Sequence, residues 1–289
     1  GLLVAILGGF IFVFPRFFVG DYLNRRSYDL PFIVRDYILK ENIQITNVVI
    51  AYMDDDSHKQ LDQSFERGWD RGVHARFLDR MREDGAKAVF FDIVFAEEKE
   101  AEDPGFAAAL AKAKNVILAA DRTRVAQGLE GGQIVPPAAT LLEALIEKDL
   151  EANVDIMEAL KRYVGIDEVI PDRDLAVRQQ KQFNLIGDQF YPLSWAAAAM
   201  AGAPITKETN GWRNEFWINY YGPPRDAIPH FSYWQALIPG NPEIAKPGYF
   251  KDKYVFVGAD LLTGFSGQRK DSYVSFYPRK VKGESGDYT

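Results

Sequence analysis

Three short apolar runs, separated by stretches with helical periodicity, limit the folds open to this chain more than any other feature of the sequence. The runs occupy residues 47–53, 88–95 and 115–120. Because each run is apolar at almost every position, both of its faces must be covered, which is typical of strands in a parallel sheet. Their alternation with helical stretches predicts βαβ crossovers and therefore an α/β fold.

The clearest helix is predicted between the first two runs. It should extend from about Val73 to Glu83, with Phe77, Leu78 and Met81 on its inward face and Gly85 as its C-cap. Further helices are expected over residues 106–113, 136–148 and 193–201, further strands over 176–178, 183–186, 215–221 and 254–258, and a hairpin turn at 187–188. We therefore expect a largely parallel, mixed central sheet with helices on both faces.

The N-terminal segment is strongly apolar. Residues 1–14 contain no polar side chain, yet at about 1.5 Å rise per residue they cover only about 21 Å of a hydrocarbon core about 30 Å thick. Since the chain begins with Gly, we interpret residues 1–20 as part of a transmembrane helix, with a secretory h-region or a buried core helix as the alternative. Residues 21–44 should then form a juxtamembrane helical segment with a kink or break at Pro31.

Composition removes several classes of function. The chain has no cysteine, so thiolate zinc sites, iron–sulfur clusters, cysteine nucleophiles and disulfides are excluded. Its 34 basic and 41 acidic residues leave a net charge of −7, which disfavours nucleic acid as a partner. The three histidines, His58, His74 and His230, are widely spaced and form no metal-binding pattern; for His74 a structural or capping role is expected rather than catalysis.

Several short fragments carry a family resemblance through their shared order and spacing. They are Arg26-Ser-Tyr-Asp29; Val48-Val-Ile-Ala51 with Asp54, Asp55 and Ser57; Val73-His-Ala75 with Leu78; Gly85-Ala-Lys-Ala88; Phe91-Asp92-Ile-Val-Phe95; Asn115-Val-Ile-Leu118; Asp172-Arg-Asp174 with Val177-Arg178; Ile218-Asn-Tyr220 with Gly222-Pro223; Phe231-Ser-Tyr233; and Lys253 with Val255, Val257 and Gly258-Ala259. On these residues the chain resembles the second class of CHASE domains, sensory modules joined to cyclases, histidine kinases and serine/threonine kinases.

The resemblance implies a membrane-anchored receptor whose sensory domain, residues 45–278, lies in the periplasm or at the cell surface. The positive-inside rule alone would keep in the cytoplasm a domain that follows Arg16, Arg25, Arg26 and Arg35, but the other flank of the helix is missing. Residues 279–289 depart from the family pattern and read as a tail or as the start of a connection to a missing C-terminal region. The resemblance implies no catalysis by this region and leaves the output enzyme open.

Acidic residues at strand ends are the candidate site. In an open parallel sheet, ligands bind beyond the carboxyl ends of the strands. Candidate ligand-binding residues are therefore Asp54, Asp55, Asp92 and Asp260, and candidate ligands for Ca²⁺ or Mg²⁺ are Asp54, Asp56 and Asp92. In the structural alternative, Asp56 and Ser57 cap helices or turns and Asp92 pairs internally. No other cofactor is expected.

The expected partners are an unknown small-molecule or ionic ligand, membrane lipid and a second copy of the chain. In such a homodimer the N-terminal helices would meet, with Gly8 and Gly9 permitting close approach. One alternative is a membrane-anchored binding or assembly protein without signalling output. A second is a phosphotransferase resembling the haloacid dehalogenases, with Asp54 as nucleophile and Asp56 as general acid, although the Thr or Val that follows the second Asp in that family is absent.

Overall fold

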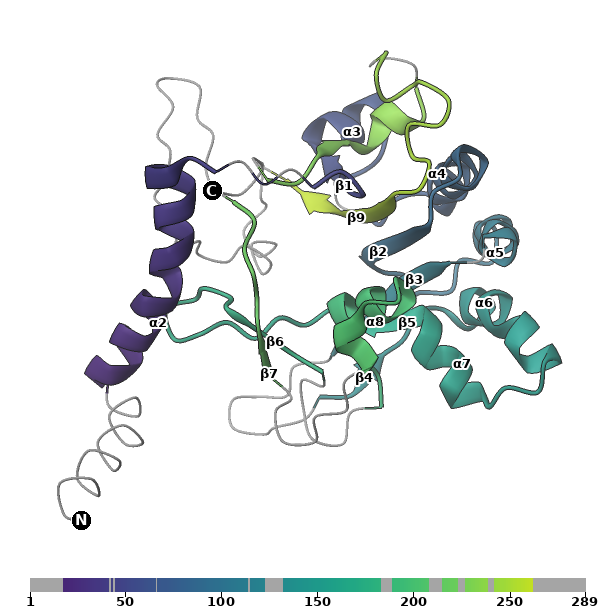
Figure 1. Ribbon diagram of the computed structural model, residues 1–289. Helices are drawn as coiled ribbons and strands as arrows, with labels where there is room; N and C mark the ends of the chain where they lie inside the picture. The colour runs from purple at the N-terminus through teal and green to yellow at the C-terminus, as the bar shows by residue number, and fades with distance from the viewer. Residues whose placement is uncertain are drawn as a thin grey trace. The chain divides into compact units, whose positions relative to one another are not determined.

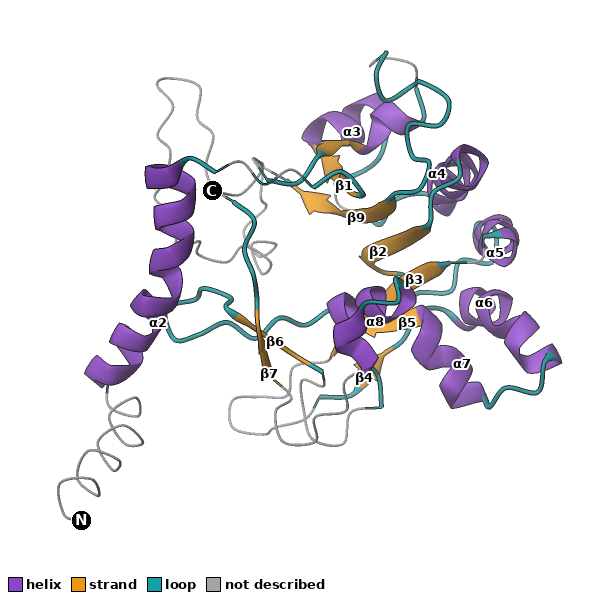
Figure 2. Cartoon of the chain, viewed as in Figure 1, coloured by secondary structure: helices purple, strands orange, loops and turns teal. Residues whose placement is uncertain are grey.

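The computed structural model describes residues 18–41, 43, 45–65, 67–113, 115–122, 132–182, 189–207, 215–222, 227–238 and 242–261. The chain divides into two compact units (Figures 1 and 2). The first unit combines Gly1–Gln44, Asn219–Ala227 and Val274–Thr289, and the second combines Ile45–Ile218 and Ile228–Tyr273.

The first unit contains a helix that changes its winding near its end. Helix α2 (Phe18–Ile33) passes through Pro31 without ending, and continues as a π-helix, η2 (Val34–Leu39). Proline removes one helical N–H and crowds the preceding turn, so the break expected at Pro31 is replaced by wider winding three residues later. Tyr220 packs on this helix, because its carbonyl oxygen accepts a 2.6 Å hydrogen bond from Arg35 and its ring lies 6.0 Å from that of Phe32.

The predicted membrane helix falls largely outside the described residues, since residues 1–17 are not among them. Within the described ranges, no helix has both the length and the apolar character needed to cross a bilayer.

The second unit is built on a seven-stranded sheet. Its order is β4-β3-β2-β9-β1-β8, with β5 also pairing with β3. Within this sheet, all described pairings are parallel except that of β4 with β3. The strands are β1 (Val48–Asp54), β2 (Ala88–Val94), β3 (Val116–Arg122), β4 (Ile134–Val135), β5 (Val164–Ile166), β8 (His230–Ser232) and β9 (Tyr254–Asp260). The prediction of an α/β fold with a mixed, mostly parallel sheet is confirmed.

Strand β9 lies between β1 and β2, the two strands that come first in the sequence. It pairs with β1 along its whole length, from Val48↔Tyr254 to Asp54↔Asp260, and with β2 from Ala88↔Tyr254 to Phe91↔Val257. Consecutive strands of the sequence are therefore not always neighbours in the sheet.

The helices of the second unit follow most of the expected positions. They are α3 (Asp55–Gln60), α4 (Arg71–Asp84), α5 (Asp103–Lys112), α6 (Ala139–Glu151), α7 (Ile156–Tyr163) and α8 (Leu193–Met200), with 3₁₀ turns η3 (Pro204–Lys207) and η4 (Tyr233–Ala236). Helices α3 and α7 and the short strands β4, β5 and β8 were not predicted; a polar loop was expected in place of α3. Residues 176–178 form no strand; instead β6 (Gln179–Lys181) pairs antiparallel with β7 (Glu215–Trp217). The strand expected at 183–186 and the hairpin turn expected at 187–188 lie outside the described residues.

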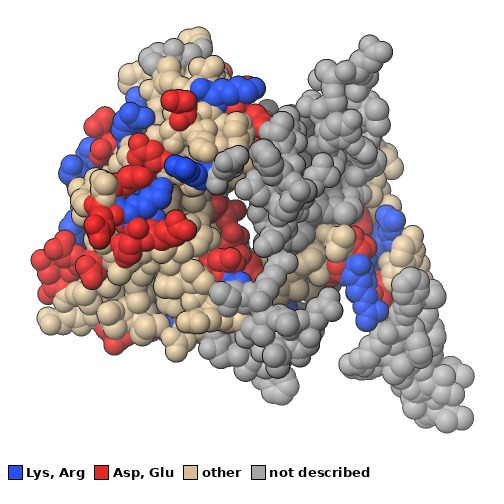
Figure 3. Space-filling model, turned by 180° about the vertical axis from the view of Figure 1, so that it is seen from behind, with Lys and Arg blue, Asp and Glu red and all other residues tan. Residues whose placement is uncertain are grey.

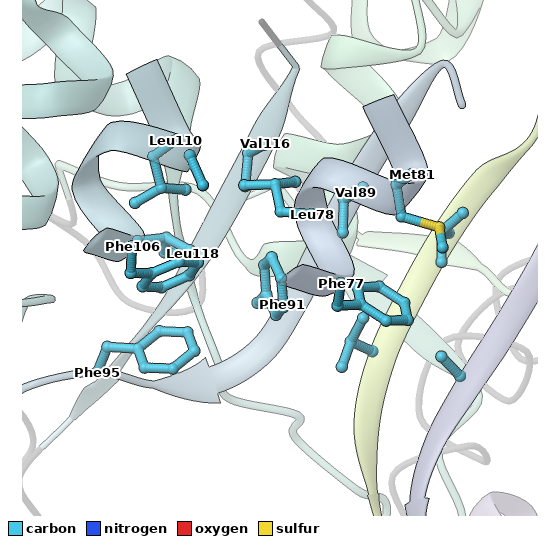
Figure 4. Packing of buried hydrophobic residues seen from close by; sticks show 14 of the residues in the cluster. Phe77, Leu78, Met81, Val89, Phe91, Phe95, Phe106, Leu110, Val116 and Leu118 are labelled. Atoms are coloured by element: carbon cyan, nitrogen blue, oxygen red, sulfur yellow. The ribbon is translucent and has the colours of Figure 1, made fainter. Parts of the chain in front are cut away.

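One face of the sheet carries the main core. Phe77, Leu78 and Met81 of α4 are almost fully buried, as predicted. They belong to one core cluster that also contains residues of β2 and α5 (Figure 4). Gly85 ends α4 at φ 82°, a left-handed conformation that glycine adopts without steric cost. Burial of each such side chain stabilises the fold by about 1.5–3 kcal/mol, so this layer contributes strongly to holding the strands together.

The opposite face is covered by α8 over β2, β3 and β5. Ala196 and Ala197 pack against Phe90 and Ile117, and their small size lets the helix approach closely. At Gly165 of β5 an added Cβ would lie 2.5 Å from the Cα of Leu193, so only glycine fits this contact. Helices thus pack on both faces, as predicted. On β1 the side chains of this face are only half-buried; they are Val48, Ile50 and Tyr52.

Candidate functional site

The carboxyl ends of β1, β9 and β2 bring three aspartates to one face of the sheet. Asp54 and Asp260 are directly paired in register. Asp92 lies beside Gly258 of β9: a Cβ added at Gly258 would be 3.7 Å from the Oδ2 atom of Asp92. Because side chains alternate along a strand, all three aspartates share the face on which α8 packs. We call Asp54, Asp55, Asp56, Asp92 and Asp260 the acidic edge.

Asp54 has a structural role in this edge. It is the N-cap of α3, because its Oδ1 atom accepts hydrogen bonds from the N–H and hydroxyl of Ser57, at 2.8 and 2.6 Å. Its Oδ2 atom accepts a hydrogen bond from the hydroxyl of Ser232 on β8. The capping residue is therefore Asp54 rather than Asp56. A nucleophilic role for Asp54, as in the phosphotransferase alternative, would compete with these three bonds.

The remaining aspartates differ in accessibility. Asp55 and Asp56 occupy the first turn of α3, where the helix dipole stabilises negative charge. Asp56 and Asp92 are exposed, and Asp55 and Asp260 are half-buried. Of these, Asp92 presents the most accessible carboxylate on the sheet itself.

The candidate metal ligands Asp54, Asp56 and Asp92 are not gathered. In the part of the chain that the structure describes, no three His, Asp or Glu side chains lie close enough together to hold a metal ion. The physical reason is the position of β9. Neighbouring strands lie about 4.8 Å apart, so β9 separates the strand that carries Asp54 from the strand that carries Asp92 by about twice that distance.

A buried polar and aromatic cluster lies on the other face of the same strands. His74 of α4 is 1% exposed, and its Nδ1 atom is 3.0 Å from the hydroxyl of Tyr233. The ring of Trp69 stacks on the imidazole with centroids 5.9 Å apart. Burial, with the nearby cations of Arg71 and Lys99, lowers the pKa of His74 from 6.5 to about 3. His74 is therefore a neutral structural group, as expected from the sequence.

An ion pair that sequence reasoning missed lies close to this cluster. Arg71, the first residue of α4, pairs with Asp103, the first residue of α5, and their side chains are only 3% and 2% exposed. The Arg71 guanidinium also donates to the carbonyl of Glu97, while Asp103 accepts a 2.6 Å bond from the N–H of Lys99. The only signal in the sequence is a charged residue at each helix start, and nothing local pairs two residues 32 positions apart.

The hydrogen-bonding pattern extends to the carboxylate of Glu102. Its Oε2 atom accepts a 2.9 Å bond from the backbone N–H of Arg71, and this bond is the main cause that lowers the pKa of Glu102. The loop between β2 and α5 is thus held at the carboxyl end of the sheet by charged groups. On the described surface seen in Figure 3, acidic and basic side chains lie intermixed.

The protein is thus an α/β domain with a densely packed core and acidic residues at the carboxyl ends of its central strands. Comparison with known protein families matches residues 2–273 to the CHASE2 domain, and the chain belongs to this family. CHASE2 is an extracytoplasmic sensory domain associated with cyclases and kinases, and no catalytic role is known for it by itself. Neither a curated protein nor a solved structure matches the chain significantly. The resemblance drawn from the short sequence fragments is confirmed.

Proposed function

We propose that this chain is the ligand-sensing, extracytoplasmic part of a membrane-anchored receptor whose output is a cyclase or a kinase. The CHASE2 match over residues 2–273 is the observation that carries the proposal. The architecture is consistent with it, because ligands of open α/β sheets bind beyond the carboxyl ends of the strands, where this sheet carries accessible polar residues.

Within this proposal the acidic edge contacts a small cationic or polar ligand. Asp92 is the primary contact, because its carboxylate is exposed and lies next to Gly258. Asp55 and Asp260 lie at neighbouring strand ends and add negative potential. Asp54 contributes mainly by holding α3 and β8 in place through its three hydrogen bonds.

The receptor would work as a homodimer anchored in membrane lipid by its N-terminal segment. A single helix transmits a change in a distant domain only by moving against a partner, and a shift of about 1–2 Å is typical of such transitions. The mass of the full chain in detergent, measured by light scattering, tests this part directly: a dimer is expected, and a monomer at all concentrations contradicts it.

The sensing function is tested with a chimeric receptor. The chain is joined to the catalytic domain of an adenylate cyclase in membranes, and cyclic AMP is measured against a library of polar small molecules. We expect at least one compound to change the output, and Asp92→Asn to remove that response. Asp79→Asn, which alters an exposed acid on α4, is the matched control and should respond like the unmodified chain.

The same measurement distinguishes the proposed receptor from a protein that binds a ligand without signalling. If compounds that bind the purified chain leave the output of the chimera unchanged, the protein is a binding or assembly module. If the response persists in Asp92→Asn, sensing stands but the acidic edge is not the contact surface.

A further inference from the structure

A pocket of about 380 Å³ lies between α7 and α8, and the sequence did not predict it. One wall comes from Glu158, Lys161 and Arg162 of α7, and the other from α8. Asn115, which directly precedes β3, also lines it, so the pocket lies toward the amino end of that strand. The acidic edge lies at the carboxyl ends of the strands. The pocket is therefore a separate site, and its volume is in the range typical of small-molecule sites, about 300–1,000 Å³.

The α8 wall of the pocket is apolar. It consists of Ala196, Ala199 and Met200. Ala199 is exposed, and its small side chain leaves this part of the pocket open. The unbranched thioether of methionine adapts to different shapes. This wall can therefore accept apolar or aromatic groups of different shapes.

The α7 wall carries opposite charges that can exchange partners. Lys161 and Glu158 form an exposed ion pair at 2.8 Å, and exposed pairs of this kind contribute only about 0–1 kcal/mol. Arg162 is instead paired with Asp149 at 2.6 Å. A ligand can therefore enter between Lys161 and Glu158 at little cost, whereas Arg162 already serves the packing of α7 on α6.

Tyr163 adds a neutral group to the lining. Burial, together with the neighbouring carboxylate of Asp149, raises the pKa of Tyr163 to about 12. The phenol is therefore protonated throughout the physiological range, and it adds no charge to the balance set by Lys161 and Glu158.

We propose that the pocket between α7 and α8 binds a zwitterionic ligand with an apolar or aromatic side group, of the class of a free α-amino acid. The carboxylate of the ligand pairs with Lys161 and its ammonium group pairs with Glu158, so both protein charges stay neutralised. A simple anion would take Lys161 and leave Glu158 facing a like charge, and a simple cation would do the reverse. The side group then lies against Ala199 and Met200.

This inference rests on the proposed sensory function for its biological meaning, but the binding event is measured independently. The purified full chain is titrated with L-phenylalanine by isothermal calorimetry. Two further probes, 3-phenylpropionate and 2-phenylethylamine, each lack one of the two charges. We expect one-to-one binding of L-phenylalanine, and affinities about tenfold weaker or more for each single-charge analogue.

Two variants locate the binding. Lys161→Met should weaken L-phenylalanine about tenfold or more, because one charge-assisted hydrogen bond is lost. Ala199→Trp should block the pocket, and since Ala199 is exposed the substitution leaves the fold intact, as the thermal melt will verify. Lys59→Met, which alters an exposed lysine on α3, is the matched control and should bind normally.

The proposal is overturned by any of three results: no heat with L-phenylalanine at millimolar concentration, unchanged affinity in both Lys161→Met and Ala199→Trp, or equal affinity for 3-phenylpropionate. None of these removes the sensory function. A chimera that responds to another compound through Asp92 would retain that function and reject only the amino-acid pocket.

Discussion

Ser232 donates a hydrogen bond from its hydroxyl group to the carboxylate of Asp54, although the two residues are 178 positions apart. The same carboxylate caps α3 through Ser57, and the hydroxyl of Ser57 in turn accepts a 3.3 Å bond from the N–H of Trp234. One aspartate thus connects β1, α3, β8 and the turn that follows β8. Loss of the Asp54 carboxylate is therefore expected to destabilise the fold itself, apart from any effect on ligand binding.

Replacing Asp54 should destabilise the second unit. Asp54→Ala removes an N-cap, which typically costs about 0.5–2 kcal/mol, and leaves the hydroxyl of Ser232 without its acceptor, at about 1 kcal/mol more. Asp56→Ala, at an exposed neighbour in the same turn, should change the free energy of unfolding by no more than about 0.5 kcal/mol. Urea unfolding followed by circular dichroism measures both. Equal losses in the two variants would show that Asp54 is not the structural member of the edge.

The buried pair of Arg71 and Asp103 should be more sensitive still. Asp103→Asn leaves a guanidinium buried without its counter-charge, which costs about 3–5 kcal/mol. The double variant Arg71→Met with Asp103→Leu removes both charges and should recover part of this loss. Asp79→Asn breaks only an exposed pair with Arg82 and is expected to cost less than about 1 kcal/mol. A double variant as unstable as the sum of its single variants would contradict the assignment.

The stability of the second unit should fall at acid pH through His74. The pKa of His74 is about 3 in the folded chain, against the ordinary 6.5. Between these values the unfolded chain binds a proton that the folded chain does not. The contribution of His74 is therefore complete above about pH 6.5 and declines by about 1.4 kcal/mol per pH unit as the pH falls toward 3.

The test compares slopes of unfolding free energy against pH, because slopes are independent of the stability lost by substitution itself. His74→Gln should flatten the slope between about pH 6.5 and pH 4. His230→Gln, at an exposed histidine of β8, should leave it unchanged. If the slope of His74→Gln matches that of the unmodified chain, His74 is not the residue responsible.

The proposed extracytoplasmic placement can be measured with thiol chemistry, because the natural chain contains no cysteine. Glu147→Cys and Lys251→Cys introduce single thiols at exposed positions of the second unit. In intact cells, after permeabilisation of any outer membrane, both should react with a membrane-impermeant maleimide. A cytoplasmic protein with an exposed cysteine is the control and should react only after lysis. Labelling of the two variants that also requires lysis would reject the placement.

A cation bound at the acidic edge remains a prediction of the sequence, and it now depends mainly on Asp92. A cation at 100 times its dissociation constant would raise the free energy of unfolding by about 2.7 kcal/mol. Melting of the chain with and without Ca²⁺ or Mg²⁺ measures this, and Asp92→Asn should remove any rise while Asp79→Asn keeps it. A rise that survives in Asp92→Asn would place the cation elsewhere.

Local chemistry explains what the sequence predicted well. The inward stripe of Phe77, Leu78 and Met81 follows from helical periodicity, and the end of α4 follows from the left-handed preference of Gly85. The apolar runs predicted the long parallel strands, and β3 is buried on both faces over most of its length. On β1 only one face is fully buried, although its run is equally apolar.

Long-range pairing explains what the sequence did not predict. Strands β5 and β8 are three residues long, too short to show a period, and exist because neighbouring strands offer hydrogen bonds. The insertion of β9 between β1 and β2 has no local signature, and it is what separates the predicted metal ligands. The pocket between α7 and α8 depends on the packing of two helices 30 positions apart in the sequence, one of which was not predicted.

The position of β9 also determines when the domain can fold. Strands β1 and β2 do not pair with each other, and the strand that joins them begins only at Tyr254. Until residues 254–260 are available, the edges of β1 and β2 that face each other therefore lack the strand with which both pair. Such non-local topologies fold slowly and expose strand edges meanwhile. A truncation before residue 254 removes β9, which is an interior strand and not an edge strand of the sheet. The truncated chain should therefore aggregate instead of forming a smaller domain.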